Sequence, residues 1–300
     1  MSDLVVLADE IGDALGSGQP VVALETTIVA HGFPPGEGLA VGVECERRVR
    51  EHGAIPATIA VLDGALRIGL DQVGLARVAS AGPAARKVGP RDLAACAVRG
   101  EVGATTVGGT LAACRAAGIR FMATGGVGGV HRDFAARLDV SADLSELAST
   151  ETLVVSSGVK SFLDVSATTE LLETLGVPVL GFRTDELPLF YVARGGPPVP
   201  TRVESAEDAA RIARAHWQLG RRGLLLAQPP AGGLDDVEPL IEEALDESQR
   251  RGIEGQALTP FVLAFLHERS GGRTLAVNRQ LAADNAALAA DVAAGYASLV

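Results

Sequence analysis

Two lysines, Lys87 and Lys160, stand in the 300-residue sequence against 24 arginines. A guanidinium stays protonated at any working pH, whereas a desolvated lysine can lose its proton and attack a carbonyl carbon to form a Schiff base. Taken alone, the small number of lysines is more simply explained by a general replacement of lysine by arginine along the chain, in which two lysines happen to remain. The residues around each lysine must therefore decide between a chemical role and that explanation.

Lys160 closely follows an apolar run, Thr152 to Val155, with Ser156, Ser157 and Gly158 in between. A lysine, two hydroxyls and a glycine gather just past the end of a predicted strand. Sites of α/β proteins form at the carboxyl ends of parallel strands, so this segment is the strongest local indication of chemistry.

Lys87 lies in the segment Arg86 to Asp92 (RKVGPRD), for which the sequence predicts a compact cationic turn before a helix. Such a turn is suited to hold a phosphate or a second carbonyl oxygen. An ordinary exposed basic loop is the alternative.

Glu25 directly follows the apolar run Val21 to Leu24 and precedes two threonines and the turn Ala30-His31-Gly32. A carboxyl group partly desolvated at a strand end would have a raised pKa and could act as a general acid. A strand-end carboxylate bonded to nearby backbone is an equally good interpretation.

The segment Ala123 to His131 (ATGGVGGVH) holds four glycines in the five positions from Gly125 to Gly129. A backbone without side chains can approach an anion closely. The segment does not complete the nucleotide-binding motif GxGxxG, however, and the chain contains no GxxxxGK[ST] motif. A kinase or dehydrogenase function therefore loses its main support. Taken alone, such a loop is more often a flexible turn than a ligand cradle.

Asp139 and Asp143 lie four residues apart, with His131 and Asp133 shortly before them. Oxygen ligands suit hard divalent ions such as magnesium or manganese, and one carboxylate with waters and a substrate phosphate would be enough. The alternative is that Ser141 caps a following helix and the aspartates lie at its start, where negative charge is favoured.

Short β-branched runs alternate with longer helical stretches along the chain, which predicts an α/β fold. The expected strands are Val21–Leu24, Thr58–Leu62, Ile119–Ala123, Thr152–Val155, Val177–Phe182 and Leu224–Ala227. The expected helices are Gly38–His52, Asp92–Arg99, Thr110–Ala117, Asp164–Leu175, Ala206–Leu219 and Val237–Gln249. Thr259 to Leu299 predicts two antiparallel helices around Gly271 and Gly272.

No long linker divides the chain, and the densest breaker region, Arg194 to Pro200, is short enough to be one loop. We therefore expect a single domain over residues 1–300. The composition, 47% hydrophobic with a mean hydropathy of +0.26, allows a large core and leaves apolar surface for subunit contacts, so we expect an oligomer.

The net charge of -11 argues against a nucleic-acid groove or an anionic membrane surface as partner. The acidic stretch Met1 to Leu15 lacks the basic start of a secretory or transit peptide, and no run of 18 apolar residues occurs. Cys45, Cys96 and Cys114 have no metal-site spacing and indicate a reducing compartment, where they would pack in the core. We expect a cytoplasmic protein.

The chain resembles the pseudouridine-5′-phosphate glycosidase family, also called indigoidine synthase A-like, from about Glu10 to Ala297. Several separated blocks in the right order carry this resemblance. They are Ala23–Thr27 with Ala30–Gly32, Lys87–Val88 with Arg91–Leu93, Thr105–Thr110, Ala123–His131, Asp139–Asp143, Ser156–Lys160, Thr184–Glu186 and Leu258–Phe261.

The resemblance implies a three-layer α/β/α fold with a mostly parallel central sheet, and a metal-dependent homotrimer. It also implies reversible cleavage of the C–C glycosidic bond of pseudouridine 5′-phosphate to uracil and ribose 5-phosphate, an activity of the carbon–oxygen lyase class. Lys160 matches the Schiff-base nucleophile, Glu25 the proton donor, and Asp139 the ligand of manganese or another divalent metal. Substrate-contacting positions are Lys87, the backbone at Val107, His131, Ser141, Ala142 and Asp143. Asn278 resembles a further member of the site.

An amine suits this reaction because the leaving atom is carbon and offers no lone pair to an acid. If Glu25 helps to open the ribose ring and Lys160 adds at the anomeric carbon, an iminium can collect the electrons while the uracil carbon is protonated. A Schiff-base aldolase acting on another sugar phosphate, and a non-catalytic accessory protein of pigment biosynthesis, are the alternatives. With the chain ending at Val300, no fused carbohydrate-kinase domain is expected.

The chain departs from the family pattern at Gln228-Pro229 and between Leu187 and Arg194. These departures concern loop packing or closure over the substrate rather than the chemistry.

Overall fold

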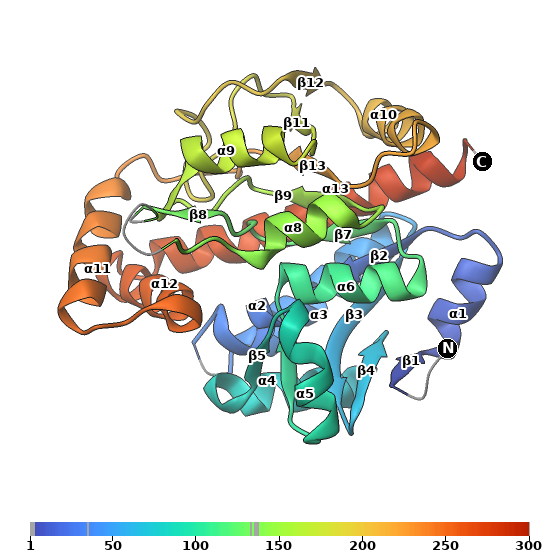
Figure 1. Ribbon diagram of the computed structural model, residues 1–300, viewed down its shortest axis with the longest axis horizontal. Helices are drawn as coiled ribbons and strands as arrows, with labels where there is room; N and C mark the ends of the chain where they lie inside the picture. Colours follow the sequence, from blue (N-terminus) through green and yellow to red (C-terminus); the bar gives the residue numbers. More distant parts are fainter. Residues whose placement is uncertain (1–3, 35, 133, 135–137, 300) are drawn as a thin grey trace.

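The computed structural model describes residues 4–34, 36–132, 134 and 138–299. Asp133 therefore lies outside the described residues. In the described part, eleven strands form one sheet, with the order β1-β4-β3-β2-β7-β9-β13-β11-β12 and with β5 and β6 attached through β3 (Figure 1). The strands are β1 Val5–Leu7, β2 Val21–Leu24, β3 Ile55–Leu62, β4 Ala65–Ile68, β5 Arg86–Val88, β6 Gly103–Thr105, β7 Phe121–Ala123, β9 Leu153–Ser156, β11 Val179–Phe182, β12 Thr201–Val203 and β13 Leu224–Ala227.

The sheet is mostly parallel, as predicted. β3 pairs in antiparallel fashion with β4 and β6, and the other pairs of this sheet are parallel. β2, β7, β9 and β13 are buried at every position, which explains their continuous apolar sequences. β8 (Val130–His131) and β10 (Leu163–Asp164) pair in antiparallel fashion as a separate two-stranded sheet.

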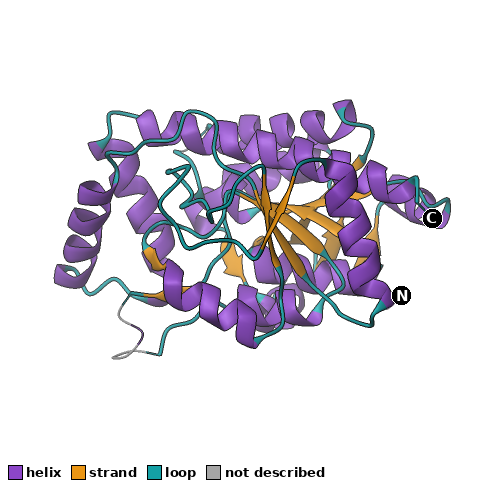
Figure 2. Ribbon diagram, turned by 90° about the horizontal axis from the view of Figure 1, so that it is seen from above, coloured by secondary structure: helices purple, strands orange, loops and turns teal. Residues whose placement is uncertain are grey.

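Helices cover both faces of the sheet, which gives the predicted three-layer arrangement (Figure 2). In the view of Figure 1, α6, α8 and α9 lie in front, while α13 runs behind the strands β7 and β9, against which it packs. The described helices are α1 Asp9–Gly16, α2 Thr27–His31, α3 Gly38–Glu51, α4 Gln72–Ala81, α5 Leu93–Val98, α6 Val107–Ala117, α8 Ala142–Ser149, α9 Val165–Thr174, α10 Ala206–Gln218, α11 Glu238–Arg250, α12 Leu258–Arg269 and α13 Arg273–Ala297.

The two C-terminal helices form with a break at Gly271 and Gly272, both of which have positive φ. They do not pack mainly against each other. α13 packs chiefly against α3 and α10, and α12 against α11, because α13 is buried along most of its length under the sheet.

The prediction of a cationic turn over Arg86 to Asp92 was wrong. Arg86 to Val88 form strand β5, paired in parallel with β6, and Pro90 to Asp92 form a 3-10 helix. The guanidinium of Arg86 lies 3.1 Å from Asp92 and 2.9 Å from Glu101, so its charge is neutralised locally. The segment presents Lys87 to the cavity, and Arg91 beside it is largely exposed.

Three neighbouring strands end in register, and this alignment builds the site. Leu24 of β2 lies opposite Ala123 of β7, which lies opposite Val155 of β9. The residues that follow therefore emerge side by side at the carboxyl edge of the sheet, where ligands of α/β proteins bind.

The three cysteines are free and buried, as expected for core packing. Among the described helices, none is both long enough and apolar enough to cross a membrane.

Candidate active site

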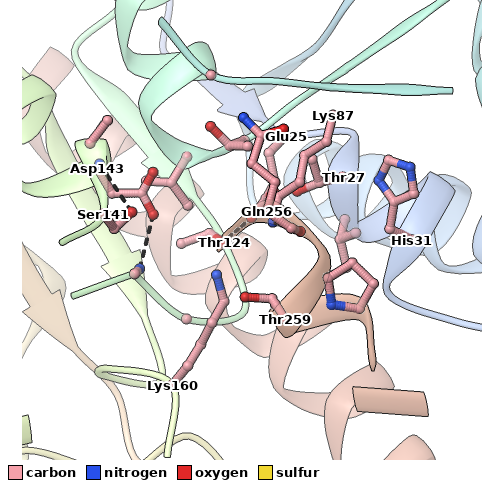
Figure 3. A pocket seen from close by; sticks show the side chains of 18 of the residues that line it. Glu25, Thr27, His31, Lys87, Thr124, Ser141, Asp143, Lys160, Gln256 and Thr259 are labelled. Carbon is pink, nitrogen blue, oxygen red and sulfur yellow. Dashed lines mark hydrogen bonds between the residues drawn. The ribbon is translucent and has the colours of Figure 1, made fainter. Parts of the chain in front are cut away.

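A cavity of about 430 Å³ opens at the carboxyl ends of β2, β7 and β9 (Figure 3). A volume of this size is typical of sites for small ligands. Every site residue predicted from the sequence lines it, as does Asn278. These residues are Glu25, Lys87, Val107, His131, Asp139, Ser141, Ala142, Asp143 and Lys160.

Glu25 is buried, with 7% of its surface exposed. Its two carboxyl oxygens accept hydrogen bonds from the hydroxyls of Thr27 and Thr124 rather than from backbone groups. Burial raises the pKa of Glu25, while the charge of Lys160 and the two hydroxyls oppose the rise. A carboxyl group in this setting can exchange a proton at a higher pH than an exposed glutamate.

Lys160 follows β9 and points into the cavity towards Thr124 (Figure 3). Its backbone N–H donates to the carbonyl of Val127 at 3.2 Å, which ties it to the glycine-rich loop. Gly158, just before it, has φ +78°, and a Cβ there would lie 1.9 Å from the carbonyl oxygen of Pro188. The turn that carries Lys160 therefore requires glycine.

Lys87 reaches the cavity from β5 and donates a hydrogen bond from Nζ to the carbonyl of Gln256 at 3.1 Å. Burial, and then the charge of Lys160, lower the pKa of Lys87 to about 8. A fraction of this amine is therefore neutral near pH 7.

Ser141 and Asp143 lie at the opposite end of the cavity from His31 (Figure 3). Ser141 caps α8 by accepting from the backbone N–H of Asp143 at 3.2 Å, as the alternative interpretation of this segment predicted. The buried carboxylate of Asp143 accepts from the N–H groups of Gly108 at 2.8 Å and Gly128 at 2.9 Å. The starts of α6 and α8 thus meet here, and helix N-termini favour anions.

Asp139 and His131 form the rim beside that end. Asp139 Oδ2 lies 3.8 Å from His131 Nε2, and the backbone N–H of His131 donates to the carbonyl of Asp139 at 3.1 Å. Within the described ranges, no group of three or more histidine, cysteine, aspartate or glutamate side chains is placed to hold a metal. One partly exposed carboxylate fits a hard cation that keeps most of its ligands as water and substrate oxygens.

The glycine-rich loop is packed closely rather than being the flexible turn that its composition favours. A Cβ on Gly128 would lie 2.4 Å from Ser141 Oγ, and one on Gly129 would lie 2.3 Å from Thr168 Oγ1. Val127, just before these two glycines, is fully buried. The glycines allow the loop to pass between the two hydroxyl side chains.

Several cavity residues were not singled out from the sequence. Thr27 and Thr124 bind Glu25, while Gln256, in a 3-10 helix (Gly255–Ala257) just before α12, binds Lys87. Only Thr27, two residues after Glu25, carried a local signal. The other contacts join segments that are distant in the sequence.

The fold and the site together define the class: a three-layer α/β/α protein whose cavity holds two buried carboxyl groups, Glu25 and Asp143, and two amines. The chain belongs to the indigoidine synthase A-like family, because the sequence profile of that family, described as "Indigoidine synthase A like protein", matches residues 10–295.

Relatives of full length carry a more specific name. A pseudouridine-5′-phosphate glycosidase of Streptomyces griseus is 48% identical over 97% of this chain and 92% of its own length. The protein of the same name from Sorangium cellulosum is 43% identical over 100% of this chain and 96% of its own length.

Two solved structures share the fold. The prealnumycin C-glycosynthase AlnA, solved in complex with ribulose 5-phosphate, is 38% identical with a TM-score of 0.90 and covers 100% of this chain and 99% of its own. An indigoidine synthase A-like protein from Thermotoga maritima is 36% identical with a TM-score of 0.87, covering 98% of this chain and 97% of its own.

Proposed function

We propose that this protein is a pseudouridine-5′-phosphate glycosidase that cleaves the C–C bond between uracil and ribose 5-phosphate reversibly. The observation that carries the proposal is the single cavity in which Glu25, Lys87 and Lys160 meet at the aligned ends of parallel strands. Relatives that bear this name over their full length support it.

The amine of Lys160 attacks C1′ of the ribose while the C1′–O4′ bond breaks and its electron pair leaves with O4′, which takes a proton from Glu25. The secondary ammonium so formed gives a proton back to the Glu25 carboxylate, which passes it to C5 of uracil. The nitrogen lone pair then forms the C1′=N bond as the C1′–C5 bond breaks and its electron pair restores the C5=C6 double bond of uracil. Water hydrolyses the resulting iminium to ribose 5-phosphate and restores the amine. Lys87 would hold the phosphate or assist the proton transfer.

The first prediction concerns Lys160. Purified protein should release uracil from pseudouridine 5′-phosphate, and Lys160→Ala should lower kcat by a factor on the order of 10³ or more, because the covalent route is lost. Lys160→Arg keeps the charge without a usable amine and should be equally inactive. Borohydride with ribose 5-phosphate, followed by peptide mapping, should label the Lys160 peptide. A label on Lys87 alone would reassign the nucleophile, and Lys87 has the lowered pKa that such a role needs.

A Schiff-base enzyme acting on a ketose phosphate is the second candidate. The likeness to AlnA, whose structure holds ribulose 5-phosphate, favours testing it. The same assay distinguishes the two candidates. If the protein cleaved ribulose 5-phosphate or formed an adduct with it, and released no uracil from pseudouridine 5′-phosphate, the glycosidase function would be wrong.

The second prediction concerns the metal. Asp139 would hold manganese or another divalent cation, which would orient polar groups and stabilise developing charge. Chelation should abolish uracil release without a fall in melting temperature, because one surface carboxylate adds little to the fold, and Mn²⁺ should restore the activity. Asp139→Asn should need far more Mn²⁺. Full activity in chelator would refute the assignment.

A further inference from the structure

The two oxygens of the Glu25 carboxyl group are each bound by a threonine hydroxyl. Thr27, the first residue of α2, donates to Oε2, and Thr124, the first residue after β7, donates to Oε1 (Figure 3). The register of β2 and β7 places Thr124 beside Glu25, since Leu24 lies opposite Ala123. Segments about a hundred residues apart thus converge on one carboxyl group.

Thr124 is held rigidly. Its backbone N–H donates to the carbonyl of Val155 at 3.0 Å, and its own carbonyl accepts from Nδ2 of Asn285 in α13 at 2.9 Å. Its hydroxyl has no other hydrogen-bond partner among the described residues than Glu25. The hydroxyl is therefore aimed at Glu25 by β9 and α13 together.

Thr27 is anchored through its neighbour. Thr26 is fully buried, its hydroxyl donates to the carbonyl of Ile59 at 2.7 Å, and it accepts from the N–H of Thr105 at 2.9 Å. In the described part of the chain, the Thr27 hydroxyl binds Glu25 and nothing else. A hydroxyl fixed in this way costs little entropy to keep in place.

An ionised carboxylate accepts both of these hydrogen bonds, whereas a carboxylic acid has a proton of its own and forces one threonine to become the acceptor. The other ionisable groups around Glu25 are the ammonium groups of Lys160 and Lys87, the carboxylate of Asp143 and the buried thiol of Cys45. Burial favours the acid, while the charge of Lys160 and then the two hydroxyls favour the carboxylate.

We infer that Thr27 and Thr124 are positioning residues for the reaction: they fix both oxygens of Glu25 and set the pH at which this group exchanges its proton. The inference rests on the proposed function, in which Glu25 gives and receives protons. The two hydroxyls, one from α2 and one from the residue after β7, oppose the rise in the pKa of Glu25 that burial causes, alongside the charge of Lys160.

The test compares Thr→Val with Thr→Ser at both positions. Valine keeps the shape and removes the donor, so in Thr27→Val and in Thr124→Val the titration midpoint of Glu25 should rise by on the order of one pH unit. Serine keeps the donor and should leave the midpoint at its wild-type value. The δ-carbon resonance of Glu25, assigned by its absence from the spectrum of Glu25→Gln, reports the midpoint without substrate.

The pH profile of uracil release should move with the NMR midpoint. Midpoints in both valine variants equal to that of the wild type, in folded protein, would overturn the inference and leave the threonines with a structural role. Absence of uracil release from the wild type would instead refute the proposed function, and the NMR titration would still decide the inference.

Discussion

The positive charge of Lys87 is unfavourable in the folded protein. Its ammonium group is removed from most solvent, has a carbonyl oxygen of Gln256 as its direct partner, and lies in the field of a second lysine. A binding or catalytic role is the natural reason to keep such a group, because a residue that only filled space would not carry the charge.

The third prediction follows from this cost. Lys87→Met should raise the free energy of unfolding at pH 7 by about 1–2 kcal/mol, after allowance for solvent screening of a partly exposed group, while uracil release falls. The pKa of Lys87 is about 8 in the folded protein and higher in the unfolded chain. The unfolded state therefore binds more protons between these values, and the native state regains stability as the pH rises through them.

The advantage of Lys87→Met should accordingly be full below pH 8 and shrink towards pH 10. The melting temperatures of the wild type and of Lys87→Met at pH 7 and at pH 10 measure this difference in stability. Lys87→Arg is the matched control, since it keeps a charge that cannot be shed and should gain nothing. A melting temperature for Lys87→Met below that of the wild type at pH 7 would contradict the account.

At the residue level, the residues chosen from the sequence and from the family resemblance all line the cavity, but their bonding partners were not predicted. Lys160 and Glu25 could be found because each directly follows a recognisable strand. Thr124 and Gln256 could not, because their bonds to Glu25 and Lys87 depend on how distant segments approach in space.

Among the elements, the glycine-rich loop fixes the distance between β7 and α8. Its backbone at Gly128 donates to Asp143 and leaves no room for a side chain beside Ser141. The loop thereby sets where the starts of α6 and α8 lie relative to Lys160.

The fourth prediction is that Gly128→Ala destabilises the protein by about 1–3 kcal/mol, because a Cβ would overlap Ser141 and Asp143, and that it also lowers uracil release. Gly12→Ala in α1 is the control. A Cβ there meets nothing within 4 Å, so the change should be neutral or stabilising by up to about 1 kcal/mol. Chemical denaturation of both variants measures the difference in stability. Equal stabilities would show that the loop can shift to make room for the added methyl group.

The long apolar strands and most helices were predicted within a few residues, because their burial and periodicity are written in the local sequence. The short strands were missed for a physical reason. β5 and β6 have three residues each, include Arg86 and Gly103, and exist through pairing with each other and with β3. Nothing local in RKV or GAT distinguishes a strand from a turn.

For the whole molecule, the cavity gathers cations on an acidic chain, and it gathers carboxyl groups as well. The chain carries a net charge of -11, yet Lys87, Lys160 and Arg91 line the cavity. Glu25, Asp92, Asp139, Asp143 and Glu146 line the same cavity, so its cations act on a phosphate at short range and do not form a positive patch.

The fifth prediction concerns assembly. We propose a homotrimer, which for 30.7 kDa chains has a mass of about 92 kDa. Exposed apolar side chains such as Val73, Val98 and Leu219 provide surface that association would cover. Light scattering during size-exclusion chromatography measures the mass. A single species near 31 kDa over a wide concentration range would refute the trimer.

The scarcity of lysine has a practical consequence. Both lysine side chains line one cavity, so a reagent that acylates amines meets its side-chain targets only inside the substrate's own space. A lysine-specific protease likewise has its two cleavage points there, flanked by folded strands and closely packed turns. The rates of amine labelling and of digestion therefore report whether the cavity is occupied. Both rates should fall when a sugar phosphate fills it.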